Sequence, residues 1–258
     1  MIEKEFNRKT INLSDNARYP LEYKLVRLER DAIEGDIIIL ALEYLHYSYR
    51  YIPKNFYNHL FSSLSFYYYN LSFQDKIKLI YKTPLTSIIY AYKEQHQKLN
   101  RTKEFIKKFQ NKDRGDKIAK FKTQLTSHAK KHTCQEYIFK DQIRYGFKIS
   151  NIFKDNIKKI KELEKDKKIK FFIIYPAVAG DNCYTTQYSK DFKEFNNKIK
   201  NILKENNITL LGNYQDSYFK KEYQYNTYYH IIEKAREIRT KRLIKSLREI
   251  LTSKEVSI

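Results

Sequence analysis

The chain has 258 residues, with 51 Lys and Arg against 30 Asp and Glu, a formal net charge of +21, 24 Tyr, 16 Phe and no Trp. With 41% hydrophobic residues, a chain of this length can bury a substantial core, which excludes an intrinsically disordered protein. No apolar run approaches the roughly 18 residues of a membrane-spanning helix, and the first residues contain no apolar signal segment. We therefore expect a globular protein that, as written, stays in the cytoplasm.

The basic excess predicts attraction to anionic partners, with an affinity that falls as salt rises. Because Lys, Asn, Ile and Tyr are all abundant, an AT-rich coding sequence is an alternative source of this charge. Nucleic acid is the less favoured partner, because the lysines are spread over the chain and tyrosine can equally form core. The two cysteines, Cys134 and Cys183, form neither a CxxC pair nor a disulfide scaffold.

The N-terminal part predicts a helix followed by a buried strand. A short β-prone stretch near Ile11 precedes a helix over about residues 20–33, in which apolar side chains recur at helical spacing. Residues 34–36 end this helix with a glycine-containing turn. The apolar run over residues 37–42 is too short for a buried helix and is rich in β-branched side chains, which predicts a parallel strand covered on both faces.

The C-terminal part repeats this alternation. A helix over residues 151–166 precedes a strand over 169–175, an apolar stripe over 192–203 predicts the next helix, and a third strand follows at 208–211. The last element is an amphipathic helix over about 229–251. Alternating strands and helices predict an α/β fold in which helices cover both faces of a parallel sheet, a three-layer α/β/α arrangement.

Residues 49–146 interrupt the alternation. Their pattern is mostly helical and polar, and Lys is concentrated between residues 98 and 131. We interpret this segment as a large helical insertion that could cover the site. The expected organisation is therefore an N-terminal part of the α/β domain over 1–48, the insertion over 49–146, and a C-terminal part over 147–258.

Ligands of open α/β sheets bind beyond the carboxyl ends of the strands, which selects the residues that follow each predicted strand. Glu43 and His46 follow the first strand. His230 opens the last helix after a run of tyrosines, and an imidazole with a pKa near about 6.5 suits proton transfer. The alternative for His230 is a structural role, packed against those tyrosines.

No metal or cofactor is predicted. His128 and His132 are spaced i, i+4 on a predicted helix with Cys134 close behind, which could supply half of a metal site, but no matching acidic or cysteine partner is evident. The chain contains no GxGxxG, GxxxxGK[ST] or HExxH motif, so the common nucleotide and zinc-peptidase interpretations have no support.

Three motifs occur in the order found in one known family. Asn226-Thr227-Tyr228-Tyr229-His230, followed by residues 233–240, resembles a D-T-x-Y-H-L stretch that leads into a G-R-x-x-R-T helix. Residues 35–44 resemble a G-D-[IV]-[IV]-x-x-x-L-E-Y strand, and Tyr175-Pro176 resembles a Y-P strand end. These motifs are similar to those of SGNH (GDSL-like) hydrolases, in the envelope-associated branch related to the D-alanyl-transfer protein of teichoic acid.

The resemblance covers nearly the whole chain outside the insertion and implies a short flavodoxin-like parallel sheet. It also implies ancestry in ester hydrolysis or O-acyl transfer, with an acylated anionic glycan or a small ester as substrate and no cofactor. By position His230 matches the catalytic base, and Asn226 stands where the branch has its Asp. Ser14, after Asn12, falls near the oxyanion-hole glycine, and Glu43 borders the site.

Two departures weaken the expected activity. The turn that carries the nucleophilic serine has no match, because residues 1–7 resemble the end of the helix that follows it. Asn226 lacks the negative charge that holds a catalytic imidazolium; in a serine protease the same replacement lowers turnover by about 10⁴. We therefore expect an N-terminally truncated domain, with the strand near Ile11 lacking a neighbour, that is inactive or incomplete. The alternative is a non-catalytic basic protein that binds an anionic glycan or nucleic acid.

Overall fold

The computed structural model describes residues 1–13, 19–49, 54–61, 65–93, 147–180, 189–225 and 229–252. These residues belong to two compact units, which we describe separately. The first unit contains residues 1–10, 32–49 and the described residues from 147 onward. The second contains 11–13, 19–31 and the described residues between 54 and 93.

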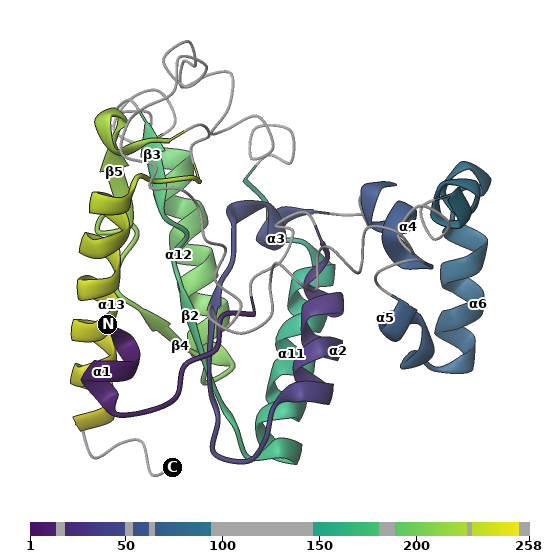
Figure 1. Ribbon diagram of the computed structural model, residues 1–258. Coiled ribbons are helices and arrows are strands. Elements are labelled where there is room, and N and C mark those ends of the chain that lie inside the picture. The colour runs from purple at the N-terminus through teal and green to yellow at the C-terminus, as the bar shows by residue number, and fades with distance from the viewer. Residues whose placement is uncertain are drawn as a thin grey trace. The chain divides into compact units, whose positions relative to one another are not determined.

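The first unit is built on a parallel sheet of three strands in the order β1-β2-β4 (Figure 1). Strand β1 spans Ile37–Ala41, β2 spans Lys170–Ile174 and β4 spans Thr209–Leu211. Ile37 lies opposite Lys170 in one ladder, and Phe172 lies opposite Thr209 in the other. The prediction of a mixed α/β fold with a small parallel sheet is confirmed.

Burial follows the position of each strand in this sheet. The central strand β2 has Phe171, Phe172 and Ile173 completely buried, as expected for an apolar run covered on both faces. Strand β1 is equally apolar, yet Ile37–Ile39 keep intermediate exposure. Among the described strands β1 pairs only with β2 and is therefore an edge strand, which is why its burial is less complete than the sequence predicts.

Long helices connect the strands of the first unit. Helix α11 (Asn151–Lys167) begins where the Ser150 hydroxyl accepts a hydrogen bond from the Phe153 N–H at 3.1 Å. It ends at Lys168, which adopts a left-handed conformation. Helix α11 contacts β2, and helix α12 (Ser189–Glu205) contacts β4. No helix within the described part of the chain is long and apolar enough to span a membrane.

One face of the sheet packs against the C-terminal helix α13 (Glu233–Thr252) and the short helix α1 (Ile2–Phe6). Phe172, Ile174 and Leu211 from the strands form a cluster with Leu247 of α13. This cluster is completed by partly buried side chains from α1, β1 and α13, namely Phe6, Ile37, Ile39, Leu243 and Ile250. Helix α13 is thus a structural part of the core.

A second, two-stranded parallel sheet joins the end of β2 to the start of α13. Strand β3 spans Val178–Gly180 and pairs with β5, Tyr218–Lys220. The short helix η1 (Lys221–Tyr223) follows β5. Around these strands Ala177, Ala179 and Phe219 pack against apolar residues that precede and open α13, namely Ile231, Ile232 and Ala235. The sequence analysis does not predict this sheet.

The second unit is helical and rich in aromatic contacts. It contains α2 (Leu21–Asp31), α4 (Lys54–Leu60), α5 (Ser65–Tyr69) and α6 (Phe73–Lys82). Its core includes Tyr23 and Phe56, whose ring centroids lie 5.8 Å apart. Helix α2 has nearly its predicted bounds. It shares this unit with the first described part of the predicted insertion, whereas residues 94–146 lie outside the described residues.

The prediction of a strand near Ile11 is wrong. Helix α1 ends at Asn7 in a left-handed conformation, and residues 8–13 form neither helix nor strand. Ile11 is 57% exposed. The segment is polar apart from two side chains and pairs with no strand among the described residues, so its local β propensity is not supported by a ladder.

Candidate functional site

The carboxyl end of β1 leads directly into a short buried helix. Glu43 precedes α3 (Tyr44–Ser48), and its carbonyl accepts a hydrogen bond from the His46 N–H at 2.9 Å. The His46 ring is buried, and its Nδ1 lies 3.3 Å from the same carbonyl. Glu43 itself is half-buried. His46 is therefore held by its own helix, whereas Glu43 lies at the edge where ligands of parallel sheets bind.

His230 lies on a small antiparallel turn before α13. The Tyr225 N–H donates to the His230 carbonyl at 2.7 Å, and the Ile232 N–H donates to the Tyr223 carbonyl at 2.9 Å. Ile231 and Ile232 are buried beside β3, which fixes this segment, while the His230 side chain is exposed. The backbone around His230 is thus anchored, and its imidazole reaches solvent.

Tyr229 connects the His230 segment to the end of β1. Its hydroxyl oxygen accepts a hydrogen bond from the Tyr44 N–H at 3.1 Å, across 185 residues of sequence. This contact joins the residue that follows Glu43 to the residue that precedes His230. Two of the positions predicted from sequence therefore belong to neighbouring segments at one edge of the sheet.

The other predicted positions belong to the second unit or lie outside the described residues. Asn12 is exposed and belongs to the second unit, whereas Glu43 and His230 belong to the first. Asn226 and Ser14 lie outside the described residues, so their predicted roles stay predictions. The candidate metal residues also lie outside the described part, namely His128, His132 and Cys134. Within the described ranges no cluster of His, Cys, Asp or Glu could hold a metal ion.

Buried tyrosines lie behind this edge, and the sequence analysis does not identify them. The Tyr44 hydroxyl donates to Asn196 Oδ1 on α12 at 3.3 Å, and the Asn196 amide donates to the Phe192 carbonyl at 2.8 Å. Tyr47 is completely buried, with its ring centroid 4.8 Å from that of Phe153. Its hydroxyl has no hydrogen-bond partner among the residues that the structure describes.

Burial raises the pKa of two tyrosines in this region, Tyr47 and Tyr175. Loss of hydration raises the pKa of Tyr47 far above its ordinary value, with a smaller contribution from Tyr175. Burial, aided by Tyr214, raises the pKa of Tyr175 to about 12. At neutral pH both side chains are hydroxyl donors and acceptors, so neither can act as a general base.

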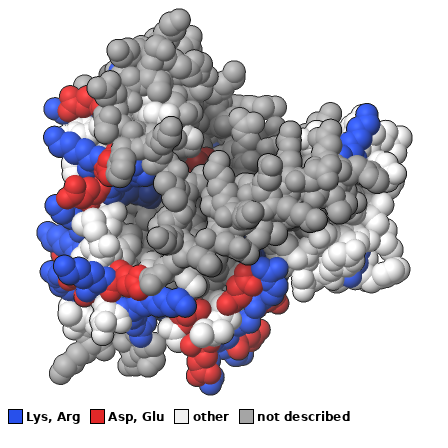
Figure 2. All heavy atoms as spheres, viewed as in Figure 1, with Lys and Arg blue, Asp and Glu red and all other residues white. Residues whose placement is uncertain are grey.

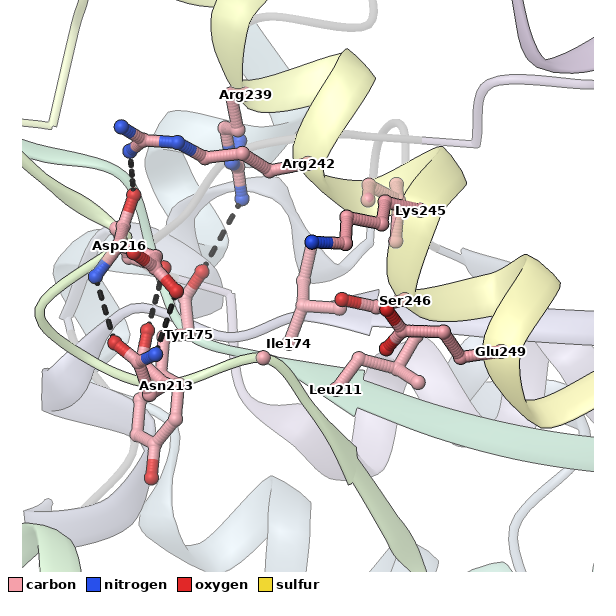
Figure 3. A pocket seen from close by; sticks show the side chains of 13 residues that line it. Ile174, Tyr175, Leu211, Asn213, Asp216, Arg239, Arg242, Lys245, Ser246 and Glu249 are labelled. Carbon is pink, nitrogen blue, oxygen red and sulfur yellow. Dashed lines mark hydrogen bonds between the residues drawn. The ribbon is translucent and has the colours of Figure 1, made fainter.

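A pocket of about 430 Å³ opens at the carboxyl ends of β2 and β4, beside α13 (Figure 3). Its floor consists of strand ends and the loop after β4, and one wall is a face of α13. Of the predicted site residues in the first unit that the structure describes, neither Glu43 nor His230 lines it. The lining residues are Ile174, Tyr175, Leu211, Gly212, Asn213, Asp216, Ser217, Arg239, Arg242, Leu243, Lys245, Ser246 and Glu249.

The loop wall of the pocket is held by hydrogen bonds. The Asp216 N–H donates to Asn213 Oδ1 at 2.8 Å, and the Asn213 amide donates to Asp216 Oδ2 at 2.5 Å. The Arg242 guanidinium donates to the Asp216 carbonyl and lies over the Phe219 ring, 5.4 Å from its centroid. This loop is therefore fixed against α13.

Arg239 lies deepest of the cations. Its guanidinium donates to the Tyr175 carbonyl at 3.4 Å, and burial lowers the pKa of Arg239. The residue is half-buried, whereas Arg242 and Lys245 are exposed. Arg239 belongs to the G-R-x-x-R-T-like motif, so the sequence indicated that this stretch of the last helix could be functional. Nothing in the sequence indicated that Arg239 lies beside Tyr175.

Comparisons with known proteins add no assignment: no family model, no curated protein and no solved structure matches the chain. The interpretation of the segment of His230 and of the pocket beside α13 therefore depends on their own geometry and on the sequence motifs.

Proposed function

We propose that the chain is an SGNH-like domain related to enzymes that hydrolyse or transfer acyl esters of cell-envelope polysaccharides. The proposed frame has three layers, with α11 and α12 on one face of the sheet and α13 with α1 on the other. Support for this arrangement comes from the cluster of Phe172 and Ile174 with α13, and from the complete burial of Phe171 and Ile173, which alternate with them along β2.

The observation that carries the proposal is the hydrogen bond from the Tyr44 N–H to the Tyr229 hydroxyl. An SGNH-like arrangement requires the histidine before the last helix to lie beyond the carboxyl ends of the strands. This contact ties the segment of His230 to the end of β1, whose sequence resembles the family's G-D to E-Y strand. The two motifs are thus neighbours in space, as the resemblance requires.

We further propose that the segment of His230, beside the end of β1, binds an acyl ester without hydrolysing or transferring the acyl group. None of the five glycines of the chain is followed by serine at either of the next two positions, so no G-x-S turn is present in the sequence given. Asn226 is neutral where an aspartate would stabilise the imidazolium of His230. In this proposal the exposed imidazole N–H of His230 donates a single hydrogen bond to the carbonyl oxygen of the ester.

The experiment combines an activity assay with NMR of the full chain. With p-nitrophenyl acetate we expect a rate equal to that of buffer; activity that disappears in His230→Ala would contradict the absence of turnover. With an O-acetylated xylo-oligosaccharide we expect the imidazole signals of His230 to shift, with no shift from the same oligosaccharide after deacetylation. The signals of His59, in the other unit, serve as the control. Unchanged His230 signals would refute the site.

A second candidate function is non-catalytic binding of an anionic glycan or nucleic acid. The observation that favours it is the charge of +21 together with the cations that gather over α13, where Lys and Arg are interspersed with fewer acidic side chains in Figure 2. We expect the affinity for such a polymer to fall steeply between about 50 and 200 mM salt. Polymer affinity that does not change over this range would exclude the electrostatic mechanism.

A further inference from the structure

The pocket beside α13 is lined by three cationic side chains for which the described part of the chain supplies no ion-pair partner. Arg239, Arg242 and Lys245 lie at successive intervals of three residues on α13, and all three line the pocket. The guanidinium contacts are to backbone carbonyls of Tyr175 and Asp216. Among the described residues, no carboxylate forms a salt bridge with any of these three cations, although the same helix forms the pair Lys241–Glu237.

Two carboxylates, Asp216 and Glu249, also line the pocket and lower its net charge. Asp216 accepts from the Asn213 amide, so part of its hydrogen-bonding capacity is used within the loop. Glu249 is exposed on α13, one turn beyond Lys245. With three cations and two carboxylates the lining has a net charge of +1. Burial lowers the pKa of the half-buried cation, Arg239.

The size and surface of the pocket suit a small polar ligand rather than a single ion. Pockets for small organic ligands begin at roughly 300 Å³, and this one measures about 430 Å³. Ser217 and Ser246 add hydroxyl groups, while Ile174, Leu211 and Leu243 supply apolar surface. Figure 3 shows Arg239 and Lys245 directed from α13 toward the space above the ends of the strands.

We infer that this pocket binds the phosphate group of a small phosphorylated sugar. A phosphate monoester carries a charge of about −1.5 to −2 at neutral pH, so it can pair with Arg239 and Lys245 at the same time, whereas a carboxylate has only one charge. Arg239 supplies a planar set of N–H donors at the base of the pocket, and Lys245 supplies a mobile ammonium group at its rim. The apolar side chains and serine hydroxyls then face the sugar ring.

This inference depends on neither proposed function. It assigns one pocket and one chemical group, whereas the ester proposal concerns the segment of His230 and the polymer proposal concerns the overall charge together with all the cations over α13. Ester binding at His230 can fail while the pocket still binds phosphate, and the reverse also holds.

The test measures binding to the full chain by isothermal titration at fixed ionic strength, with α-glucose 1-phosphate as the probe. We expect Arg239→Gln and Lys245→Gln to weaken this binding by about 10-fold or more, because each removes a charge-assisted hydrogen bond. The matched control is Lys241→Gln, which removes the same charge from an exposed position of α13 outside the pocket, and we expect a change of less than about 2-fold.

Several results would overturn the inference. Equal weakening by all three variants would mean that the probe responds to the general field of the helix. Glucuronate binding as tightly as glucose 1-phosphate would refute the phosphate preference, and inorganic phosphate binding as tightly would refute the sugar. Lys245 is exposed, so Lys245→Gln keeps the test valid if Arg239→Gln fails to fold. The two proposals are tested separately in Lys245→Gln. We expect this variant to lose affinity for glucose 1-phosphate while its His230 NMR signals still respond to the acetylated oligosaccharide as in the unmodified chain.

Discussion

Replacing Tyr47 by Phe tests the interior behind the carboxyl end of β1. Tyr47 has no exposed surface, and its ring packs against Phe153 and Phe195, with centroids 4.8 and 6.4 Å away. Its hydroxyl has lost its hydration and finds no hydrogen bond within the described residues. A buried hydroxyl without a partner costs roughly 1–3 kcal/mol of folding free energy. Phe keeps the ring contacts and removes this cost.

The expected net effect is a gain in the free energy of unfolding of about 1 kcal/mol. The gain is smaller than the full desolvation cost for two reasons. The void left by one oxygen atom costs a few tenths of a kcal/mol at about 24 cal/mol per Å³. The unfolded chain also changes slightly in hydration when the hydroxyl is removed.

Tyr44→Phe is the matched control, because Tyr44 is buried one turn away and its hydroxyl does have a partner. That variant removes the hydrogen bond to Asn196 and leaves a buried amide oxygen unsatisfied. We expect a loss of about 1–3 kcal/mol, opposite in sign to Tyr47→Phe. Urea titrations followed by far-UV circular dichroism measure both, provided that the slope of each transition is unchanged. If Tyr47→Phe lowers stability by more than about 0.5 kcal/mol, the hydroxyl has a partner and the reasoning is refuted.

Five further substitutions test three local features of the first unit. Ser150→Ala removes the hydroxyl that accepts from Phe153 and should cost about 1 kcal/mol in the same titration, whereas Ser150→Asp should retain most of the stability. Gly35 has φ +83°, a conformation that suits glycine, so Gly35→Ala should lower the free energy of unfolding by about 1 kcal/mol. Lys168 has φ 51°, so Lys168→Gly should raise the free energy of unfolding by about the same amount. If both variants changed the free energy of unfolding in the same direction, this argument would be contradicted. The pKa of Tyr175 is about 12 in the folded state against 10.0 ordinarily, so the unfolded state loses this proton first and stability should fall as the pH rises from 10 toward 12. Tyr175→Phe should reduce that fall; an identical pH dependence in the variant would show that other groups cause it.

The long elements could be predicted from the sequence because each contains its own signals. Helix α11 has a capping serine at its start and an apolar stripe along its length, and β2 has four consecutive apolar residues after Lys170, so both have nearly their expected bounds. Strands β3 and β5 have three residues each and show no usable periodicity. The stretch near Ile11 shows the opposite error, since local β propensity forms no strand without a neighbour.

The candidate site could be predicted only as a region. The rule that ligands bind beyond the carboxyl ends of parallel strands selects Glu43 and the segment of His230 without any coordinates. The contact between Tyr44 and Tyr229 joins residues 185 positions apart, and no local pattern encodes it. The position of Arg239 beside Tyr175 likewise depends on how α13 packs against the sheet, which follows from the tertiary arrangement of Leu243 and Leu247.

Helix α13 both packs in two hydrophobic clusters and forms a wall of the pocket, and this combination affects how the protein responds to ligands. Ala235 near its start joins the cluster around β3, Leu247 near its end anchors the main sheet, and the basic pocket opens between them. Local unwinding of the middle of α13 would therefore disturb both clusters at once. Amide protons along this helix should exchange with solvent cooperatively, and any occupant of the pocket should slow that exchange across the whole helix by mass action.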